Sequence, residues 1–113
     1  MDTADLLRIA LALPGVEQRS RDRGYLALEV AGRAFAQVPD GGDTVALKAT
    51  RQEQAALVAA DPTVYAASHV SGRFGWLVVR LRHADTGEVR ELVTEAWRHT
   101  APRRLVERHD QRA

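Results

Sequence analysis

The sequence predicts an α+β fold: a two-layer sandwich of one antiparallel sheet with helices on one face, in the order α-β-β-β-α-β(β)-α. Three observations lead to this prediction. Apolar residues recur at helical spacing near both ends and in the middle of the chain, short alternating runs with tight turns lie between them, and no linker or repeat divides the 113 residues. This is the commonest size for one domain, so residues 1–113 are expected to share one core.

The first predicted element is an N-terminal helix. Thr3 is a suitable N-cap, because its hydroxyl can accept a hydrogen bond from a free amide of the first turn. The apolar residues that follow at helical spacing are Leu6, Ile9, Ala10 and Leu13. Pro14-Gly15 ends the helix near Leu13, and the polar segment from Glu17 to Gly24 is predicted to be a loop.

Three short strands are predicted to follow this loop. They cover Tyr25–Val30, Ala34–Val38 and Thr44–Lys48. Apolar residues alternate along the first strand, with both of its leucines and Val30 on one face. The connections are short and rich in turn residues, notably Pro39 to Asp43. Short turns make sequential strands antiparallel neighbours, so we expect a β-meander.

A second helix is predicted in the middle of the chain. Thr50-Arg51-Gln52-Glu53 has the form of a capping box, in which a hydroxyl N-cap is followed three residues later by a carboxylate. The helix runs to about Ala60, where Asp61-Pro62 ends it. Residues 64–66 fit either a short strand or a helical turn, and Ser68 to Gly75 is predicted to be a loop.

A late strand and a last helical region complete the fold. Trp76–Arg82 is predicted to be a strand, and the sequence leaves open which of its two faces is buried. Asp85 can cap the following helix, with Glu88 at its third position. The apolar positions of this helix are Val89, Leu92, Val93, Ala96 and Trp97. Pro102 fits the first turn of a separate or kinked final helix.

Composition excludes several classes of protein. The chain has no Cys, so a disulfide framework, a thiolate nucleophile and a cysteine zinc site are ruled out. The first apolar run contains Arg8 and follows two aspartates, unlike a signal peptide. No run reaches the ~20 apolar residues that span a bilayer. We therefore expect a soluble, cytoplasmic protein.

Charge is almost balanced, with 16 Lys and Arg against 15 Asp and Glu and a formal net charge of +1. Lys48 is the single lysine, so the other basic residues are all arginine. This bias fits either a GC-rich genome, which encodes Arg in place of Lys, or recognition of phosphate or carboxylate by guanidinium groups. A net charge of +1 lacks the strong overall field of a dedicated nucleic-acid-binding protein.

Several short motifs occur in a fixed order along the chain. They are Ala12-Leu13-Pro14-Gly15-Val16-Glu17, Val30-Ala31-Gly32-Arg33-Ala34-Phe35-Ala36, Leu47-Lys48, Gly75-Trp76-Leu77-Val78-Val79-Arg80-Leu81, and Leu92-Val93-Thr94-Glu95-Ala96-Trp97-Arg98 with Ala101-Pro102. In this order and spacing they resemble the MmcQ/YjbR family, from about Asp5 to His109.

The resemblance implies a fold similar to that of the type III secretion chaperones and of the N-terminal domain of TfoX-like proteins. It also implies a DNA-binding role. The chain departs from the family at Arg33, where Lys is common, and at Ala34, where an aromatic or bulky residue is common. The first change keeps the positive charge, and the second affects local packing.

No catalytic or metal-binding pattern is evident in the sequence. The four histidines, His69, His83, His99 and His109, lie on different elements without H-x-x-x-H or H-E-x-x-H spacing. Neither a metal site nor a cofactor is therefore predicted. Acidic residues fall at turns, helix caps and exposed faces, and the serines lack a nucleophile motif. We expect that the protein is not an enzyme.

Basic residues form three groups that could contact nucleic acid. The first group is Arg19, Arg21 and Arg23 in the predicted loop, and the second is Arg98, Arg103, Arg104, Arg108 and Arg112 near the C-terminus. Late basic residues also stabilise a helix dipole. The third group is the predicted site on the sheet: Arg33, Lys48, Arg73, Trp76 and Arg80. A ring beside cations suits base stacking and phosphate contact, although Trp76 fits the core or a dimer contact equally well.

Three functions follow from these observations. The first is weak, largely sequence-independent binding of DNA or another nucleic acid through its phosphates. The second is binding or sequestration of a small molecule, because relatives of the family are encoded near antibiotic biosynthesis genes; the Ser68–Trp76 loop and Tyr65 would border the pocket. The third is protein interaction or homodimerisation through the open sheet face or a strand edge.

Overall fold

The computed structural model describes residues 1–112, with the side chains of residues 69–71 and 112 excepted. The helices are α1 (Thr3–Leu11), α2 (Arg51–Ala60), α3 (Thr86–Arg98) and α4 (Arg103–Arg112), and a 3-10 turn, η1, covers Leu81–His83. The strands are β1 (Val16–Arg21), β2 (Tyr25–Val30), β3 (Arg33–Pro39), β4 (Thr44–Thr50), β5 (Tyr65–Ser71) and β6 (Phe74–Arg80). The side chains of His69 and Arg112, considered above, lie outside the described part.

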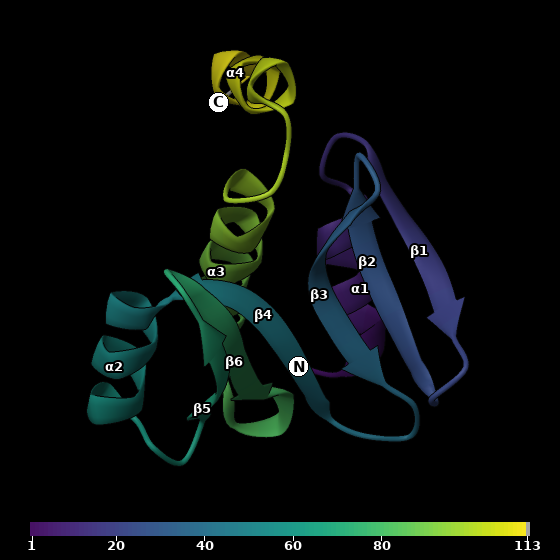
Figure 1. The fold of residues 1–113 in the computed structure, drawn as a ribbon. Coiled ribbons are helices and arrows are strands. Elements are labelled where there is room, and N and C mark those ends of the chain that lie inside the picture. The colour runs from purple at the N-terminus through teal and green to yellow at the C-terminus, as the bar shows by residue number, and fades with distance from the viewer. Residues whose placement is uncertain (113) are drawn as a thin grey trace.

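All six strands form one antiparallel sheet in the order β1-β2-β3-β4-β6-β5 (Figure 1). The predicted meander is present and has one more strand than expected, because β1 precedes it. The last strand, β6, lies between β4 and the outer strand β5. The β4–β6 ladder pairs at seven positions, from Thr44 to Thr50, whereas β3 meets β4 at only two. The sheet therefore consists of two well-paired halves joined at a short seam.

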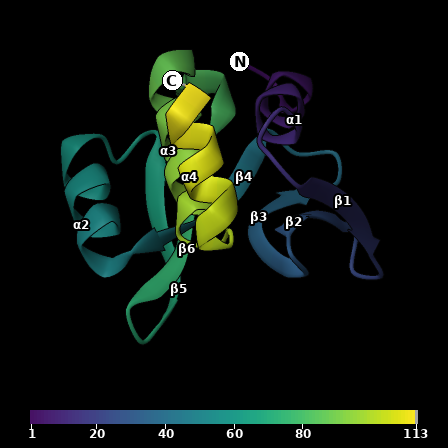
Figure 2. The same cartoon turned by 90° about the horizontal axis from the view of Figure 1, so that it is seen from above.

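The helices cover one face of this sheet, which confirms the predicted α+β sandwich. α1 and α3 lie side by side over the sheet, with α3 in contact with both β3 and β4, and α2 flanks β5 (Figure 2). The largest side chains in the core are Trp97 on α3 and Phe35 on β3, both with no exposed surface. Trp97 Nε1 also donates to the Pro14 carbonyl oxygen at 3.0 Å. No described helix has the length and apolar character needed to cross a membrane.

The question that the sequence left open for the late strand has a clear answer. Leu77 and Val79 are fully buried against the helices, so the intervening side chains point to the opposite, open face of the sheet. Trp76 is half-buried on that face and Arg80 is exposed. Lys48 pairs directly with Trp76 across the β4–β6 ladder and shares the open face.

Both predicted loops are wrong. Most of the segment from Glu17 to Gly24 belongs to β1, which pairs with β2 along its whole length. Five of the six residues of β1 are exposed, so this edge strand carries no apolar alternation to reveal it. Ser68 to Gly75 is spanned by β5 and β6, which turn at Gly72. Of the two alternatives for residues 64–66, the strand is correct from Tyr65 onward.

Element ends differ from prediction where a neighbouring residue makes the better cap. Asp2, not Thr3, caps α1, and its carboxylate accepts the Asp5 N–H at 2.9 Å. α1 ends at Leu11 instead of near Leu13. The late strand ends at Arg80 because the chain then forms η1. The predicted caps of α2 and α3 are confirmed.

Candidate functional site

Three basic side chains from three separate elements lie near the beginning of β6. They are Lys48 on β4, Arg51 in the first turn of α2, and Arg73 in the turn before β6, and we call them the basic cluster. Lys48 Nζ lies 5.0 Å from the centre of the Phe74 ring, and the Arg73 guanidinium carbon lies 5.8 Å from it. A ring attracts cations at these distances. Phe74 therefore interacts with two positive charges of the cluster.

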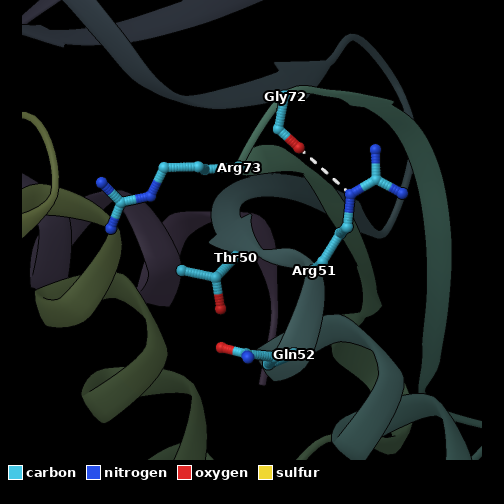
Figure 3. A pocket seen from close by; sticks show the side chains of 5 residues that line it. All are labelled: Thr50, Arg51, Gln52, Gly72 and Arg73. Carbon is cyan, nitrogen blue, oxygen red and sulfur yellow. Dashed lines mark hydrogen bonds between the residues drawn. The ribbon is translucent and has the colours of Figure 1, made fainter.

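A pocket of about 540 Å³ opens between the start of α2 and the β5–β6 turn (Figure 3). Its lining residues are Thr50, Arg51, Gln52, Gly72 and Arg73. Arg51 Nε donates to the Gly72 carbonyl oxygen at 3.1 Å, and the Arg51 backbone N–H donates to the Arg73 carbonyl oxygen at 3.2 Å. These bonds tie α2 to the turn, so that two guanidinium groups from different elements border one pocket.

The first turn of α2 also shapes the electrostatics of the pocket. Thr50 and Glu53 exchange two hydrogen bonds, from the Glu53 N–H to Thr50 Oγ1 at 3.1 Å and from the Thr50 N–H to Glu53 Oε1 at 2.8 Å. Burial raises the pKa of the Glu53 carboxyl, but hydrogen bonds from Thr50 and His99 outweigh it and leave that pKa lowered. The Glu53 carboxyl is therefore charged at neutral pH. It contacts the His99 side chain of α3.

Two of the three arginines of the predicted group on residues 19–23 share one carboxylate within the fold. Arg19 Nε lies 3.3 Å from the Glu29 carboxylate, and Arg21 pairs with the same carboxylate. Glu29 is only 5% exposed on β2, where a carboxylate needs such partners. These two arginines therefore have a structural role in holding β1 against β2.

The C-terminal basic group is also partly paired. Arg98 forms a two-pronged ion pair with Asp110, and Arg103 Nε lies 3.0 Å from Glu107. By contrast, among the described side chains no carboxylate forms an ion pair with Lys48, Arg51 or Arg73. The basic cluster is thus one group whose charge has no ion-pair partner among the described side chains and is available to a ligand.

The structure brings together some of the predicted site residues and separates others. Lys48, Trp76 and Arg73 lie around the same end of the β4–β6 ladder. Arg80 lies at the other end, where it pairs with Thr44 and its Nη1 donates to two loop carbonyls at 3.3 and 3.2 Å. Arg33 is exposed at the start of β3, away from the two positions at which β3 pairs with β4.

Sequence reasoning missed two residues of this site. The sequence pattern predicts Arg51 only as an interior residue of a capping box and Phe74 only as part of a loop. The capping box itself could have revealed Arg51, because a side chain next to an N-cap lies at the helix end. The sequence pattern could not reveal Phe74, because its contacts with Lys48 and Arg73 depend on the β4–β6 register.

Two carboxylates and an imidazole also lie close together on the side of Phe74 that contacts His99. Glu53 on α2 and Glu95 and His99 on α3 each present a ligand atom, and these three atoms all lie within 4.8 Å of one another. His99 Nε2 is 3.0 Å from Glu53 Oε1, and its ring centre is 5.1 Å from that of Phe74. The histidines have no metal-ligand spacing among themselves, but the i, i+4 spacing of Glu95 and His99 in the sequence could have indicated this cluster.

Comparisons with known proteins agree with the fold described above. The YjbR family model matches residues 11–99. A crystal structure of Deinococcus radiodurans protein DR2400, which contains a DUF419 domain, superposes with a TM-score of 0.75 at 20% identity, covering 85% of this chain and 75% of that chain. At this identity the superposition demonstrates similarity of fold alone. The molecule is an α+β protein of one six-stranded antiparallel sheet with four helices.

The chain belongs to the YjbR family, as the resemblance predicted. Uncharacterized proteins of Mycobacterium bovis and Mycobacterium tuberculosis are 33% identical to it over 70 residues, which is 61% of this chain and 54% of theirs. The chain thus spans about half the length of these relatives.

Proposed function

We propose that the basic cluster binds the phosphate backbone of nucleic acid, weakly and largely without regard to sequence. The supporting observation is that three cations have no ion-pair partner among the described side chains, with Arg51 and Arg73 lining a pocket of about 540 Å³ and Lys48 beside the Phe74 ring that Arg73 also contacts. Phosphates would supply the negative charge that Lys48, Arg51 and Arg73 lack within the fold. Trp76, half-buried beside Lys48, offers a ring on which a base can stack.

In this proposal the protein acts by binding and carries out no reaction. Guanidinium groups stay protonated at neutral pH and donate several hydrogen bonds in a fixed plane, which suits phosphate oxygens. The site presents the end of a ladder, a turn and the first turn of α2, so contacts to base edges would be few. Affinity would therefore depend on charge more than on sequence.

Salt dependence is the direct test of this proposal. Three neutralised phosphates give a slope that weakens binding by about 40-fold for duplex DNA and about 20-fold for single strands between about 50 and 200 mM salt. Filter binding of labelled oligonucleotides of mixed sequence measures both. Affinity that does not change with salt, or no binding at low salt, would contradict the proposal.

Substitutions then locate the binding site. Lys48→Ala and Arg73→Ala should each weaken binding to all sequences and lower the salt slope by about 1, because each removes one phosphate contact. Arg104→Ala, on the exposed side of α4, is the matched control and should leave the slope unchanged. Equal losses in all three variants would mean that binding is spread over the surface and is not centred on the basic cluster.

A second candidate function is binding of a small anionic molecule. The pocket volume of about 540 Å³ lies in the range typical of small-molecule sites, and two arginines border it. The particular pocket expected from the sequence, between Trp76 and Tyr65, does not form, because these side chains lie on opposite faces of the sheet. Competition between inorganic phosphate and oligonucleotide for the protein would connect the two candidates.

Homodimerisation stays a prediction, for which sedimentation is the measurement.

A further inference from the structure

Glu53, Glu95 and His99 form a compact set of metal-type ligands at the junction of α2 and α3. Their ligand atoms lie within 4.8 Å of one another, and the closest pair, Glu53 Oε1 and His99 Nε2, is 3.0 Å apart. Ligand atoms about 2.0–2.1 Å from a tetrahedral metal ion are themselves roughly 3.3 Å apart. Small side-chain movements would therefore bring all three onto one ion.

The arrangement on the two helices is the kind that metal sites use. Glu95 and His99 are four residues apart on α3 and so lie on the same side of that helix. Glu53 comes from the first turn of a different helix, which closes the set from a second direction. One imidazole nitrogen and two carboxylates suit a borderline divalent ion such as Zn²⁺, with a position left for water.

Neighbouring groups already hold these side chains in place. The Thr50 N–H donates to Glu53 Oε1, and the Phe74 ring packs against the His99 ring at 5.1 Å between centres. Hydrogen bonds and packing of this kind orient metal ligands in known sites. Arg98 Nε, 3.5 Å from Glu95, is the nearby competitor, but its guanidinium is engaged by Asp110.

We propose that Glu53, Glu95 and His99 bind a divalent transition-metal ion of the zinc type. This site is separate from the pocket of the basic cluster, although Phe74 contacts both His99 and the cations Lys48 and Arg73. A bound cation would neutralise Glu53 and Glu95, which meet His99 beside the Phe74 ring. Metal binding would therefore make the positive field around Lys48 and Arg73 stronger, which links it to anion binding.

Cobalt absorbance provides the test. The full chain, first treated with a chelator, is titrated with Co²⁺ and the visible d–d absorption is followed, with Zn²⁺ then added as competitor. We expect one equivalent of Co²⁺ to give an absorption that Zn²⁺ abolishes. Loss of a partner that only orients a ligand typically lowers metal affinity 10–100-fold, so Glu95→Gln and His99→Gln should each lower it by at least about tenfold.

Two controls make the result specific to this site. Glu91→Gln removes an exposed carboxylate one turn earlier on α3, and His83→Gln removes an exposed imidazole from η1. Both should keep the affinity of the unaltered chain. Glu95 is exposed, so Glu95→Gln should fold normally by circular dichroism and keeps the test valid even where His99→Gln does not fold. No absorption with Co²⁺, or an equal titration in Glu95→Gln, would overturn the proposal.

Discussion

Tyr65 joins the sheet to the first turn of α3 through a single hydroxyl. The residue is 3% exposed, and its Oη donates a hydrogen bond to the Glu88 carboxylate. Burial, and then the hydrogen bond to Glu88, raise the pKa of the Tyr65 hydroxyl above its ordinary value. The native protein therefore keeps this proton at alkaline pH, where the unfolded chain has lost it.

This difference predicts a pH dependence of stability. The contribution of Tyr65 is fully present below about pH 10, the pKa of an unfolded tyrosine, and is lost as pH rises toward the higher native pKa. Urea unfolding should show a free energy of unfolding that falls above about pH 10. Tyr65→Phe should fall less steeply over the same range, because it has no proton to lose. Parallel curves for the two proteins would refute the prediction.

At the scale of single residues, the sequence revealed positions that depend on local pattern. Alternation along the late strand correctly placed Trp76 and Arg80 on the face opposite Val79. It could not show that Arg80 bonds to loop carbonyls far from Lys48, because that depends on where the preceding loop packs. Likewise, His99 and Glu53 are 46 residues apart and meet only because the fold brings the first turn of α2 beside the C-terminal end of α3.

At the scale of elements, the polar sequence of one strand, β1, made it unpredictable from hydrophobic pattern. β1 is a run of exposed polar residues after Val16, and its membership of the sheet comes from backbone pairing with β2. Backbone hydrogen bonds are available to any sequence except proline, so side-chain pattern is a poor guide to an edge strand. The caps of α2 and α3 were predictable because they depend only on residues within one turn.

Gly15 shows how two elements constrain one residue between α1 and β1. Its φ is +72°, a conformation that favours glycine, and a Cβ at this position would lie 3.1 Å from Leu105 Cδ1 on α4. Gly32 has a similar φ of +78°, but a Cβ there would have nothing within 4 Å. A substitution at Gly32 therefore tests backbone strain alone, whereas one at Gly15 tests backbone strain together with packing.

Substitution by alanine should distinguish these costs. Gly32→Ala should destabilise the fold by about 1–2 kcal/mol, the cost of a left-handed residue. Gly15→Ala should cost about 2–4 kcal/mol, because overpacking against Leu105 adds to the strain. Urea unfolding measures both, and in a Leu105→Ala background the excess for Gly15 should disappear. An unchanged excess in that background would show that Leu105 is not its cause.

At the scale of the whole molecule, the sheet is strongest on the side of β6. β6 is paired on both sides, and its ladder with β4 covers seven positions. The seam between β3 and β4 has two paired positions and is spanned by α3, which contacts both strands. Cooperation between the two halves of the sheet therefore depends on packing by α3 as much as on backbone hydrogen bonds.

Amide hydrogen exchange should follow this division. Amides of β6 should exchange most slowly, because their opening requires disruption of two ladders, whereas paired amides of β3 next to the seam should exchange at least about tenfold faster. Exchange followed by NMR resolves the individual residues. Equal protection of β3 and β6 would mean that the sheet opens as one unit and that the seam has no separate stability.

The overall architecture was the most predictable level. Helical periodicity and turn-linked strands gave the α+β class and the helices on one face, and both are confirmed by the structure. The position of β6 between β4 and β5 was not predictable, because a chain that leaves the sheet through α2 can return directly beside β4 or one strand further out, where β6 then fills the gap.

The two tryptophans allow ligand binding and unfolding to be followed by the intrinsic fluorescence of the protein. Trp97 is sealed in the core, whereas Trp76 is half-buried on the open face beside Lys48. Iodide in solution can reach the indole of Trp76 but not that of Trp97, so the emission of the native protein divides into a quenchable and a protected part. A ligand at the basic cluster would shield the first part alone, and unfolding would expose the second. Occupancy and stability can thus be followed in one unlabelled sample.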